Sequence, residues 1–259
     1  MRQFYLTFPN WNALRSELTW THYRLLLKVE KDEARSFYVN EAIYSNWSTR
    51  ELERQIDALL YERLALSKNK KKTRQLANNG HLVKTAQDLI KDPYVLEFIN
   101  VKENHALTEK DLEQNLIDRL QDFLLELGKG FAFIARQKRI TVDNDHFYVD
   151  LVFYNYLLRC FVLVDLKIGK LTHQDIGQMD FYVRYFEQEE KRLDDNPTIG
   201  LILCSAKNES MVKYTLLGQN KRIFAARYKL YLPSEKELQK ELDEERAKIE
   251  MERKLLKRS

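Results

Sequence analysis

The chain has 259 residues, of which 44% are hydrophobic and 32% charged, with only seven glycines and four prolines, and its formal net charge is +4. This composition excludes collagen-like and low-complexity chains, and the small positive charge permits a nucleic-acid partner without requiring one. The two cysteines lie in apolar runs and make no disulfide framework, and no apolar stretch reaches the ~20 residues that span a bilayer, so we expect a cytoplasmic protein with no membrane partner.

The first hundred residues are predicted to be helical, because apolar and aromatic side chains recur there at helical spacing. Helices are predicted over residues 20–29, 33–44 and 48–66. Ser48 followed by Glu51 has the pattern of a capping box, and Asp32 is placed to cap the helix over 33–44. We therefore assign residues 1–95 to a mostly helical N-terminal domain.

A basic run follows the third helix and contains Lys68, Lys70, Lys71, Lys72 and Arg74. Like charges at this density repel and gain nothing from packing, which favours a solvated, flexible linker. The same charges are also suited to contact phosphates, which makes Lys70, Lys71 and Lys72 candidate nucleic-acid contacts. Both interpretations remain open.

After a connector over residues 96–107, residues 108–232 are predicted to form an α/β domain. The pattern indicates a helix over 108–127 and strands over 131–142, 146–155 and 159–169 that form an antiparallel meander. A helix over 172–191, a strand over 197–206, a helix over 210–218 and a strand over 222–232 follow. This order predicts helices packed on a central mixed sheet. Residues 233–259 are nearly all charged or helix-forming and are expected to be a charged C-terminal helix.

Two carboxylates interrupt apolar strands, which is costly unless a cation or a hydrogen bond compensates. Asp150 lies in YVDLVFY and Asp165 in FVLVDLK. Side chains alternate along a strand, so Asp165 and Lys167 share a face, and pairing of the two strands would bring Asp150 beside them. Magnesium takes carboxylate oxygens, and a metal held there would polarise a phosphate and activate a water.

A single Asp-x-Lys on a strand is in most proteins a salt bridge at the edge of a sheet. Here an upstream helix that carries Glu113 and a downstream helix that carries Gln178 accompany the two acids, and this combination favours a catalytic site. Nearby cations are placed to line a phosphate track; they are Arg136, Lys138 and Arg139.

Many long segments of the chain resemble the YhcG-type family of PD-(D/E)xK nuclease-domain proteins. In the α/β region they are LLELGKGFAFIARQKR, FYVDLVFYN, LRCFVLVDLKIGK, GQMDFYVRY, NPTIGLILC and YKLYLP. In the helical region MRQFYLTFP, LTWTHYRLLL, EARSFYVNEAI, NWSTRELERQI and LLYERLALSK resemble the domain that accompanies this nuclease. The resemblance implies a bacterial protein with a restriction-endonuclease-like core, and it implies that further helical residues precede Met1.

The resemblance also implies roles for individual residues. Asp150 and Asp165 match the two motif acids and Lys167 the motif lysine, although Val149 stands where the motif has its proline. Gln178 matches a glutamine of the following helix that is expected to steady the attacking water or a phosphate. A helix glutamate completes many such sites; Glu113 is our assignment for it, and Glu126 is the competitor.

We therefore predict a Mg²⁺- or Mn²⁺-dependent endonuclease, with DNA favoured over RNA as substrate. Asp150, Asp165 and Glu113 would hold the metal, and Lys167 and Gln178 would assist the attack of water on the phosphate. The N-terminal domain would recognise the substrate or a protein partner, and a homodimer is compatible with cutting a duplex. The alternative is a catalytically silent protein that binds nucleic acid or a partner on the same fold.

Overall fold

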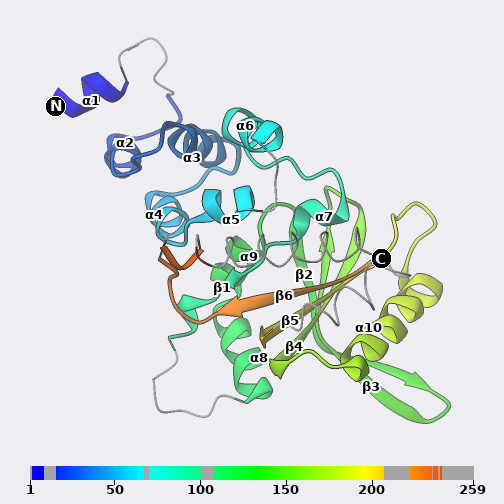
Figure 1. Ribbon diagram of the computed structural model, residues 1–259. Helices are drawn as coiled ribbons and strands as arrows, with labels where there is room; N and C mark the ends of the chain where they lie inside the picture. The colour runs from blue at the N-terminus through cyan, green and yellow to red at the C-terminus, as the bar shows by residue number, and fades with distance from the viewer. Residues whose placement is uncertain are drawn as a thin grey trace, which may run out of the picture. The chain divides into compact units, whose positions relative to one another are not determined.

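The computed structural model describes residues 2–8, 16–66, 70–100, 108–206, 222–234, 236–238 and 240. The chain divides into two compact units, one formed by residues 1–82 and 232–259 and the other by residues 83–231 (Figure 1). Within the described ranges, no helix has the length and apolar character needed to cross a membrane.

The first unit is helical, as predicted. Its buried side chains include Leu26, Phe37 and Leu52, which lie on different helices. The predicted capping box is confirmed, because the Ser48 hydroxyl accepts a hydrogen bond from the Glu51 amide and the Glu51 carboxylate accepts one from the Ser48 amide at 2.7 Å. The helices are α1 (Arg2–Thr7), α2 (Trp20–Leu26), α3 (Asp32–Tyr44), α4 (Thr49–Asp57), α5 (Leu60–Leu66) and α6 (Lys70–Asn79).

Two local predictions in this unit were wrong. The helix predicted over 48–66 breaks at Leu59, whose φ of 51° lies in the left-handed region and ends α4 before α5 begins. Asp32 is the first residue of α3 and not its cap: Lys31 holds the cap position, and the Asp32 carboxylate accepts a hydrogen bond from Arg35 at 2.5 Å.

The structure contradicts one of the two interpretations of the basic run, the flexible linker. A flexible linker is wrong from Lys70 onward, because residues 70–79 form α6. The physical reason is the apolar pair that follows the charges, since Leu76 and Ala77 are buried and anchor the helix. Lys68 lies outside the described residues. A role of the run in phosphate contact stays a prediction.

The second unit is built on a six-stranded mixed sheet in the order β1-β6-β5-β4-β3-β2. Strands β2, β3 and β4 pair antiparallel, which confirms the predicted meander, and β4-β5, β5-β6 and β6-β1 pair parallel. The strands are β1 (Tyr94–Val95), β2 (Phe131–Val142), β3 (Asp145–Asn155), β4 (Cys160–Lys170), β5 (Ile199–Ala206) and β6 (Ile223–Lys229). The helix predicted over 210–218 lies outside the described residues, as does most of the predicted C-terminal helix.

The edge strand β1 changes the division of the chain. Tyr94 and Val95, which we had placed in the helical domain, pair with Tyr228 and Lys229 of β6. Leu96, assigned to the connector, is fully buried in the core of the second unit. Residues 83–95 therefore belong with the sheet, and the two units divide between residues 82 and 83.

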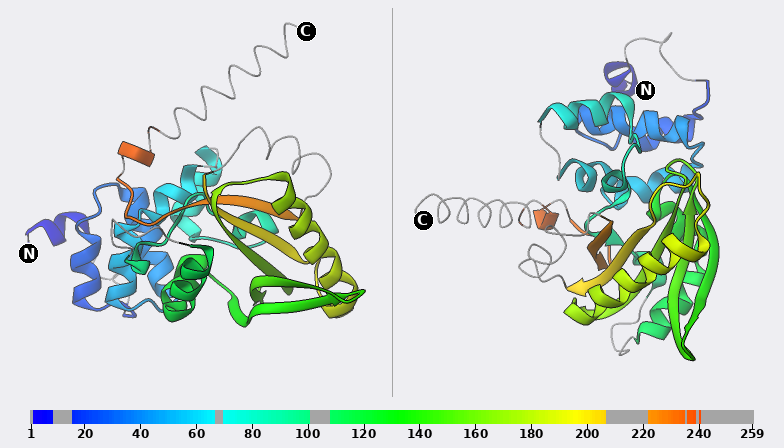
Figure 2. Two further views of the ribbon diagram at one scale, coloured as in Figure 1. Left: turned by 90° about the horizontal axis from the view of Figure 1, so that it is seen from below. Right: turned by 90° about the vertical axis from the view of Figure 1, so that its right-hand side faces the viewer.

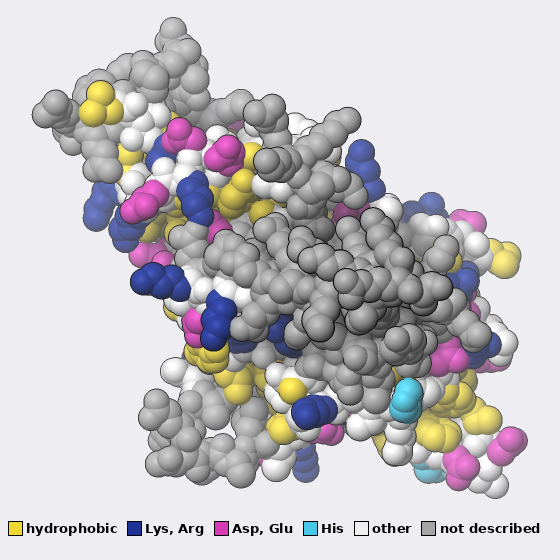
Figure 3. Space-filling view, viewed as in Figure 1, with side chains coloured by type: hydrophobic (Ala, Val, Ile, Leu, Met, Phe, Trp, Pro, Cys, Tyr) yellow, Lys and Arg dark blue, Asp and Glu magenta, His cyan; other side chains and the backbone are white. Residues whose placement is uncertain are grey.

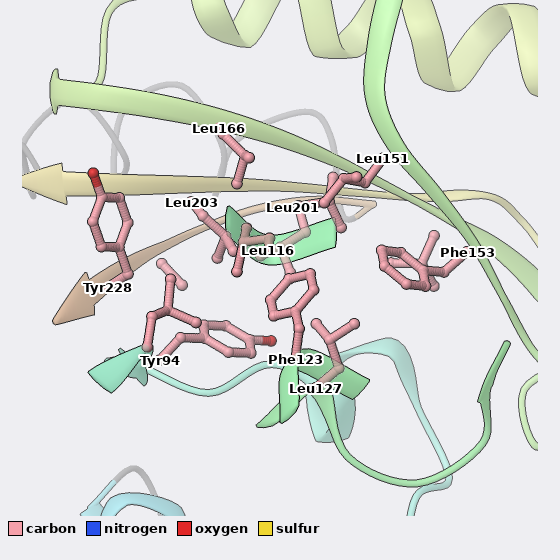
Figure 4. Close-up of a cluster of buried hydrophobic side chains, with 14 of the residues drawn as sticks. Tyr94, Leu116, Phe123, Leu127, Leu151, Phe153, Leu166, Leu201, Leu203 and Tyr228 are labelled. Atoms are coloured by element: carbon pink, nitrogen blue, oxygen red, sulfur yellow. The ribbon is translucent and has the colours of Figure 1, made fainter. Parts of the chain in front are cut away.

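Helices cover both faces of this sheet (Figures 1 and 2). One face packs against α7 (Ala86–Leu89), α8 (Glu109–Asp118) and α9 (Leu120–Leu127), with Leu116, Phe123 and Phe153 in its core (Figure 4). The helix predicted over 108–127 is broken at Arg119, whose backbone at φ −117° and ψ 35° is not helical.

The other face packs against α10 (His173–Tyr185), which continues as a π-helical turn over Phe186–Glu190. Gly200 of β5 allows a close approach here, since a Cβ at this position would lie 2.6 Å from two atoms of Met179. The acidic residues of interest lie where β3 and β4 pass between these two helical layers.

Candidate active site

The site begins at an irregularity in strands β2 and β3. Val149 packs on the α10 face of the sheet and Leu151 on the opposite face, although residues two apart in a regular strand share a face. The register pairs Arg136 with Leu151 and Lys138 with Val149, so Gln137 stands opposite Asp150. Gln137 has φ 44°, in the left-handed region. The alternation of β3 is therefore reset between Val149 and Leu151, opposite Gln137, while the register of β2 shifts earlier, between Phe133 and Ala135.

Asp150 is held at both of its carboxylate oxygens. The pairing of β3 with β4 ends at Leu151 and Val164, and beyond it the Leu166 amide donates to Asp150 Oδ2 at 2.8 Å. Gln137 Nε2 donates to Asp150 Oδ1 at 3.1 Å. The carboxylate thus takes the place of a backbone acceptor between two strands that separate here.

Asp165 and Lys167 lie on the α10 face of β4, as the strand alternation predicts. Asp165 is 1% exposed, and Lys167 Nζ lies 3.0 Å from its Oδ2. The ammonium is the ion-pair partner of this buried oxygen, and no other described residue donates a hydrogen bond to it. Burial first, and then the Asp150 carboxylate, raise the pKa of Asp165, against the opposing effect of Lys167.

Lys167 is kept protonated by its neighbours. Burial by itself favours the neutral amine, but the Asp165 and Glu109 carboxylates raise the pKa of Lys167 above its ordinary value. The ammonium therefore supplies a fixed positive charge beside the two aspartates.

Asp150 and Asp165 fit a hard divalent cation. A buried carboxylate oxygen with one ammonium partner, next to a second carboxylate, is a donor set that Mg²⁺ accepts together with waters and substrate phosphate. Among the described residues, no three Asp, Glu, His or Cys side chains converge to hold a metal, so Glu113 does not join this pair in one cluster.

Glu113 of α8 is instead linked to Asp150 by the side chain of Gln137. Its carboxylate is 5% exposed, and Oε1 accepts from Arg136 Nε at 3.1 Å. Its Oε2 accepts from Gln137 Nε2 at 2.5 Å, from the same nitrogen that donates to Asp150. Gln137 was not among the residues predicted for the site, because no motif marks it and the register shift of β2 lies earlier, between Phe133 and Ala135.

A second acid of α8 was also missed. Glu109 Oε1 accepts from the Ile168 amide at 3.0 Å, and its Oε2 lies 3.9 Å from Lys167 Nζ. Glu109 stands four residues before Glu113, so one face of α8 presents both acids to the sheet. The sequence shows this spacing, but its role follows only from the contacts of Glu109 with Ile168 and Lys167 of β4.

The structure separates the two candidates for the helix glutamate. Glu126 of α9 is fully buried, and its Oε1 accepts from the Val95 amide at 3.0 Å. It ties β1 to α9 and lies among none of the site residues above.

Gln178 reaches the site through a tyrosine. Among the described residues, its amide nitrogen donates to the Tyr182 hydroxyl and bonds neither aspartate. The Tyr182 hydroxyl donates to the Tyr148 carbonyl at 2.8 Å. Burial and the charges of Asp165 and Asp150 raise the pKa of Tyr182, which places its ring near the acid pair.

The three candidate nucleic-acid contacts of β2 differ in whether an acidic side chain already binds them. Arg136 is committed to Glu113 and to Gln114, and Lys138 Nζ lies 3.0 Å from Glu190. Arg139 is exposed. Arg136 pairs with Leu151 midway along the β2-β3 hairpin, and Arg139 pairs with Tyr148 nearer its tip, where Asp143, Asp145 and Phe147 are exposed. Figure 3 shows hydrophobic and acidic side chains together on this part of the molecule. The cations therefore lie along the middle and outer part of the hairpin, where the acids of the tip lower the local positive charge.

Comparison with known proteins places both units. A family model described as the YhcG PDDEXK nuclease domain matches residues 87–243, and one described as the DUF1016 N-terminal domain matches residues 1–63. The chain is 41% identical over 249 residues to a protein of Escherichia coli (strain K12) named "Putative nuclease YhcG". This match covers 94% of the chain and 66% of that protein, so the chain spans less than the full length of its relative.

Two solved structures resemble about half of the chain at low similarity. A repair endonuclease from Pyrococcus abyssi has 20% identity and a TM-score of 0.34 over 51% of this chain and 50% of its own. An EndoMS-dsDNA2 complex has 16% identity and a TM-score of 0.33 over 52% of this chain and 49% of its own. These values are too low for a comparison of individual residues.

Proposed function

The chain belongs to the family defined by the YhcG PDDEXK nuclease domain, and we propose from this that it hydrolyses phosphodiester bonds of DNA with the help of Mg²⁺ or Mn²⁺. The observation that carries the proposal is the carboxylate pair of Asp150 and Asp165, which has one ammonium, that of Lys167, beside it. One ammonium leaves the two carboxylates with a net negative charge, which is costly unless they take up a proton or a second cation.

In this proposal Asp150 and Asp165 hold the metal. A bound Mg²⁺ would polarise the phosphate and lower the pKa of a coordinated water. Lys167 is already protonated, so its part is to stabilise the negative charge that grows on the phosphate. Gln178 and Tyr182, joined by their hydrogen bond, line the α10 side of the site and orient water or phosphate there.

The assignment of Glu113 as a third ligand stays a prediction. Both of its oxygens accept hydrogen bonds, from Arg136 and from Gln137, and it would have to exchange one of them for a metal. The preference for DNA over RNA follows from the family resemblance, and Arg136, Lys138, Arg139 and the lysines of α6 remain the candidate phosphate contacts.

The test is a cleavage assay on end-labelled duplex, single-stranded and branched DNA and on RNA, with Mg²⁺ and Mn²⁺. We expect metal-dependent cleavage of at least one DNA and its loss in Asp165→Asn, which removes the charge at nearly constant shape. Asp145→Asn is the matched control, because it makes the same change at an exposed position of β3 and should cleave like wild type.

The alternative is a catalytically silent binding protein, and the same assay separates it from the nuclease. If wild type binds these nucleic acids but cleaves none with either metal, hydrolysis by this chain is refuted. If cleavage occurs and Asp165→Asn retains it, the acid pair is not the site.

A further inference from the structure

We propose that Gln137 is a positioning residue of the acidic site: its side-chain amide holds the Asp150 carboxylate and couples it to Glu113 of α8. The proposal rests on the proposed function for its effect on metal binding, but the contact itself can be tested without metal. No motif in the sequence assigns a role to this residue.

The geometry begins with one nitrogen that serves two acids. Gln137 Nε2 lies 2.5 Å from Glu113 Oε2 and 3.1 Å from Asp150 Oδ1. A primary amide carries two hydrogens on this nitrogen, so it can donate to both carboxylates at once. Because both acceptors are carboxylates, the amide must present its nitrogen and not its oxygen to them.

The bridge completes the fixation of Asp150. The Leu166 amide already holds Oδ2 at 2.8 Å, and Gln137 holds the remaining oxygen. With both oxygens held from different strands, rotation about the Asp150 side-chain bonds is restricted. The carboxylate is thereby kept in one orientation relative to Asp165 before a cation arrives.

The chemistry of the donor suits a cation site. An arginine or lysine at position 137 would neutralise Asp150 and compete with a metal for it. An amide donates hydrogen bonds but carries no charge, so the negative charge of Asp150 stays available. Glu113, oriented on its other oxygen by Arg136, keeps the amide turned toward Asp150.

The backbone supports the same conclusion. Gln137 has φ 44°, which residues with a side chain seldom adopt within a strand. Such a conformation persists where surrounding contacts hold it, and the two hydrogen bonds of the amide add to the pairing of Arg136 and Lys138 on either side. The conformation also lies opposite Asp150, where the alternation of β3 is reset.

The decisive variant is Gln137→Asn. Asparagine tolerates the left-handed region and keeps an amide, but it is one methylene shorter and cannot reach both carboxylates. Gln114→Asn is the matched control: Gln114 is also exposed, its amide also donates to a carboxylate, that of Asp118, and it also contacts Arg136, but it does not touch Asp150.

The first measurement is a Mn²⁺ titration followed by the paramagnetic resonance signal of the free ion. We expect Gln137→Asn to weaken Mn²⁺ binding by about tenfold, the lower end of the range for residues that orient a metal ligand. Gln114→Asn should bind Mn²⁺ like wild type. Both substitutions are at exposed residues, so we expect both variants to fold. Far-ultraviolet circular dichroism spectra equal to that of wild type would show this. Equal affinity of wild type and Gln137→Asn would overturn the proposal.

The second measurement uses metal-free protein and a double-mutant cycle of Gln137→Asn with Asp150→Asn. Coupled residues should lower the melting temperature of the double variant by less than the sum of the single losses. Additive losses would contradict the contact and with it the proposal. If wild type binds no Mn²⁺ and the cycle still shows coupling, the proposed function fails and the action of Gln137 on a metal ligand fails with it, whereas the link to Asp150 stands.

Discussion

At the scale of single residues, the site is defined by Asp165, a carboxylate that is buried in an apolar strand. Asp165 lies in a strand whose neighbours Val164 and Leu166 are fully buried. The sequence allowed its position beside Lys167 and Asp150 to be predicted, because strand alternation and a short turn are local features. It did not reveal Gln137 or Glu109, since their contacts join segments distant along the chain and depend on side-chain orientation.

The pKa of Asp165 predicts how the metal-free protein responds to pH. Burial and Asp150 raise this pKa from 3.8 to about 7, so the folded state retains a proton that the unfolded chain releases. This contribution to stability is fully present below pH 3.8 and is lost as pH rises toward 7. The raised pKa of Lys167 acts only in strongly alkaline solution and does not enter this window.

We therefore expect the free energy of unfolding to contain a loss on the order of 4 kcal/mol between pH 4 and pH 8 that is absent from Asp165→Asn, because the shift spans about three pKa units and one unit corresponds to about 1.4 kcal/mol. Urea unfolding across this range, with a chelator present, measures it. Asp145→Asn should keep the pH dependence of wild type. Parallel curves for wild type and Asp165→Asn would show that Asp165 does not titrate in this way.

Lys167 should matter for hydrolysis and not for metal affinity. Replacement by glutamine removes a charge that opposes a cation at Asp165, so Lys167→Gln should bind Mn²⁺ at least as tightly as wild type. Cleavage should fall by about 10²–10³-fold, as expected when a group that stabilises a transition-state charge is removed. Lys170→Gln on the same strand is the control for both assays. Weaker Mn²⁺ binding by Lys167→Gln would argue against this division of roles.

At the scale of elements, the pattern of strands was predictable and their ends and partners were less so. The meander of β2, β3 and β4 follows from alternating apolar runs joined by short turns. The breaks at Leu59 and Arg119 depend on single backbone conformations that helical periodicity does not show. Strand β1 has two residues and exists only because β6 pairs with it, so no local pattern marks it.

The close approach of α10 to β5 gives a test with two glycines. A Cβ at Gly200 would lie 2.6 Å from Met179, so Gly200→Ala should lower the free energy of unfolding by about 1–3 kcal/mol through overpacking. Gly177 of α10 has nothing within 4 Å of the added atom, and Gly177→Ala should stabilise by roughly 0.5–1 kcal/mol through helix propensity. Urea unfolding measures both.

Equal effects of these two substitutions would mean that Met179 does not pack against Gly200. A second variant confirms the origin of the strain, because shortening the side chain in Met179→Ala should reduce the cost of Gly200→Ala. The double-mutant cycle therefore tests the seating of the helix that carries Gln178 and Tyr182.

At the scale of the whole molecule, the net charge of +4 is small. In the proposed function, nucleic-acid binding therefore depends on local groups of Lys and Arg. Arg139 is exposed and lies near the tip of the β2-β3 hairpin, while Arg136 and Lys138 are paired with acids. Arg139→Ala should weaken duplex DNA binding to a similar degree for all sequences and lower the slope of log affinity against log salt by about 1.

The control for this prediction is Arg159→Ala, an exposed arginine in the turn between β3 and β4, paired with Asp194. Fluorescence anisotropy at several salt concentrations provides the affinities, with a chelator present to prevent cleavage. An unchanged slope for Arg139→Ala would place the phosphate track elsewhere, with the lysines of α6 as the next candidates.

The central claim is that Asp150 and Asp165 hold a divalent metal, and the most direct test is anomalous diffraction from crystals grown with Mn²⁺. We predict an anomalous peak in contact with both carboxylates, and no peak at this place in crystals of Asp165→Asn grown in the same way. A Mn²⁺ peak bound elsewhere in a protein that cleaves DNA, with this pair empty, would contradict the account.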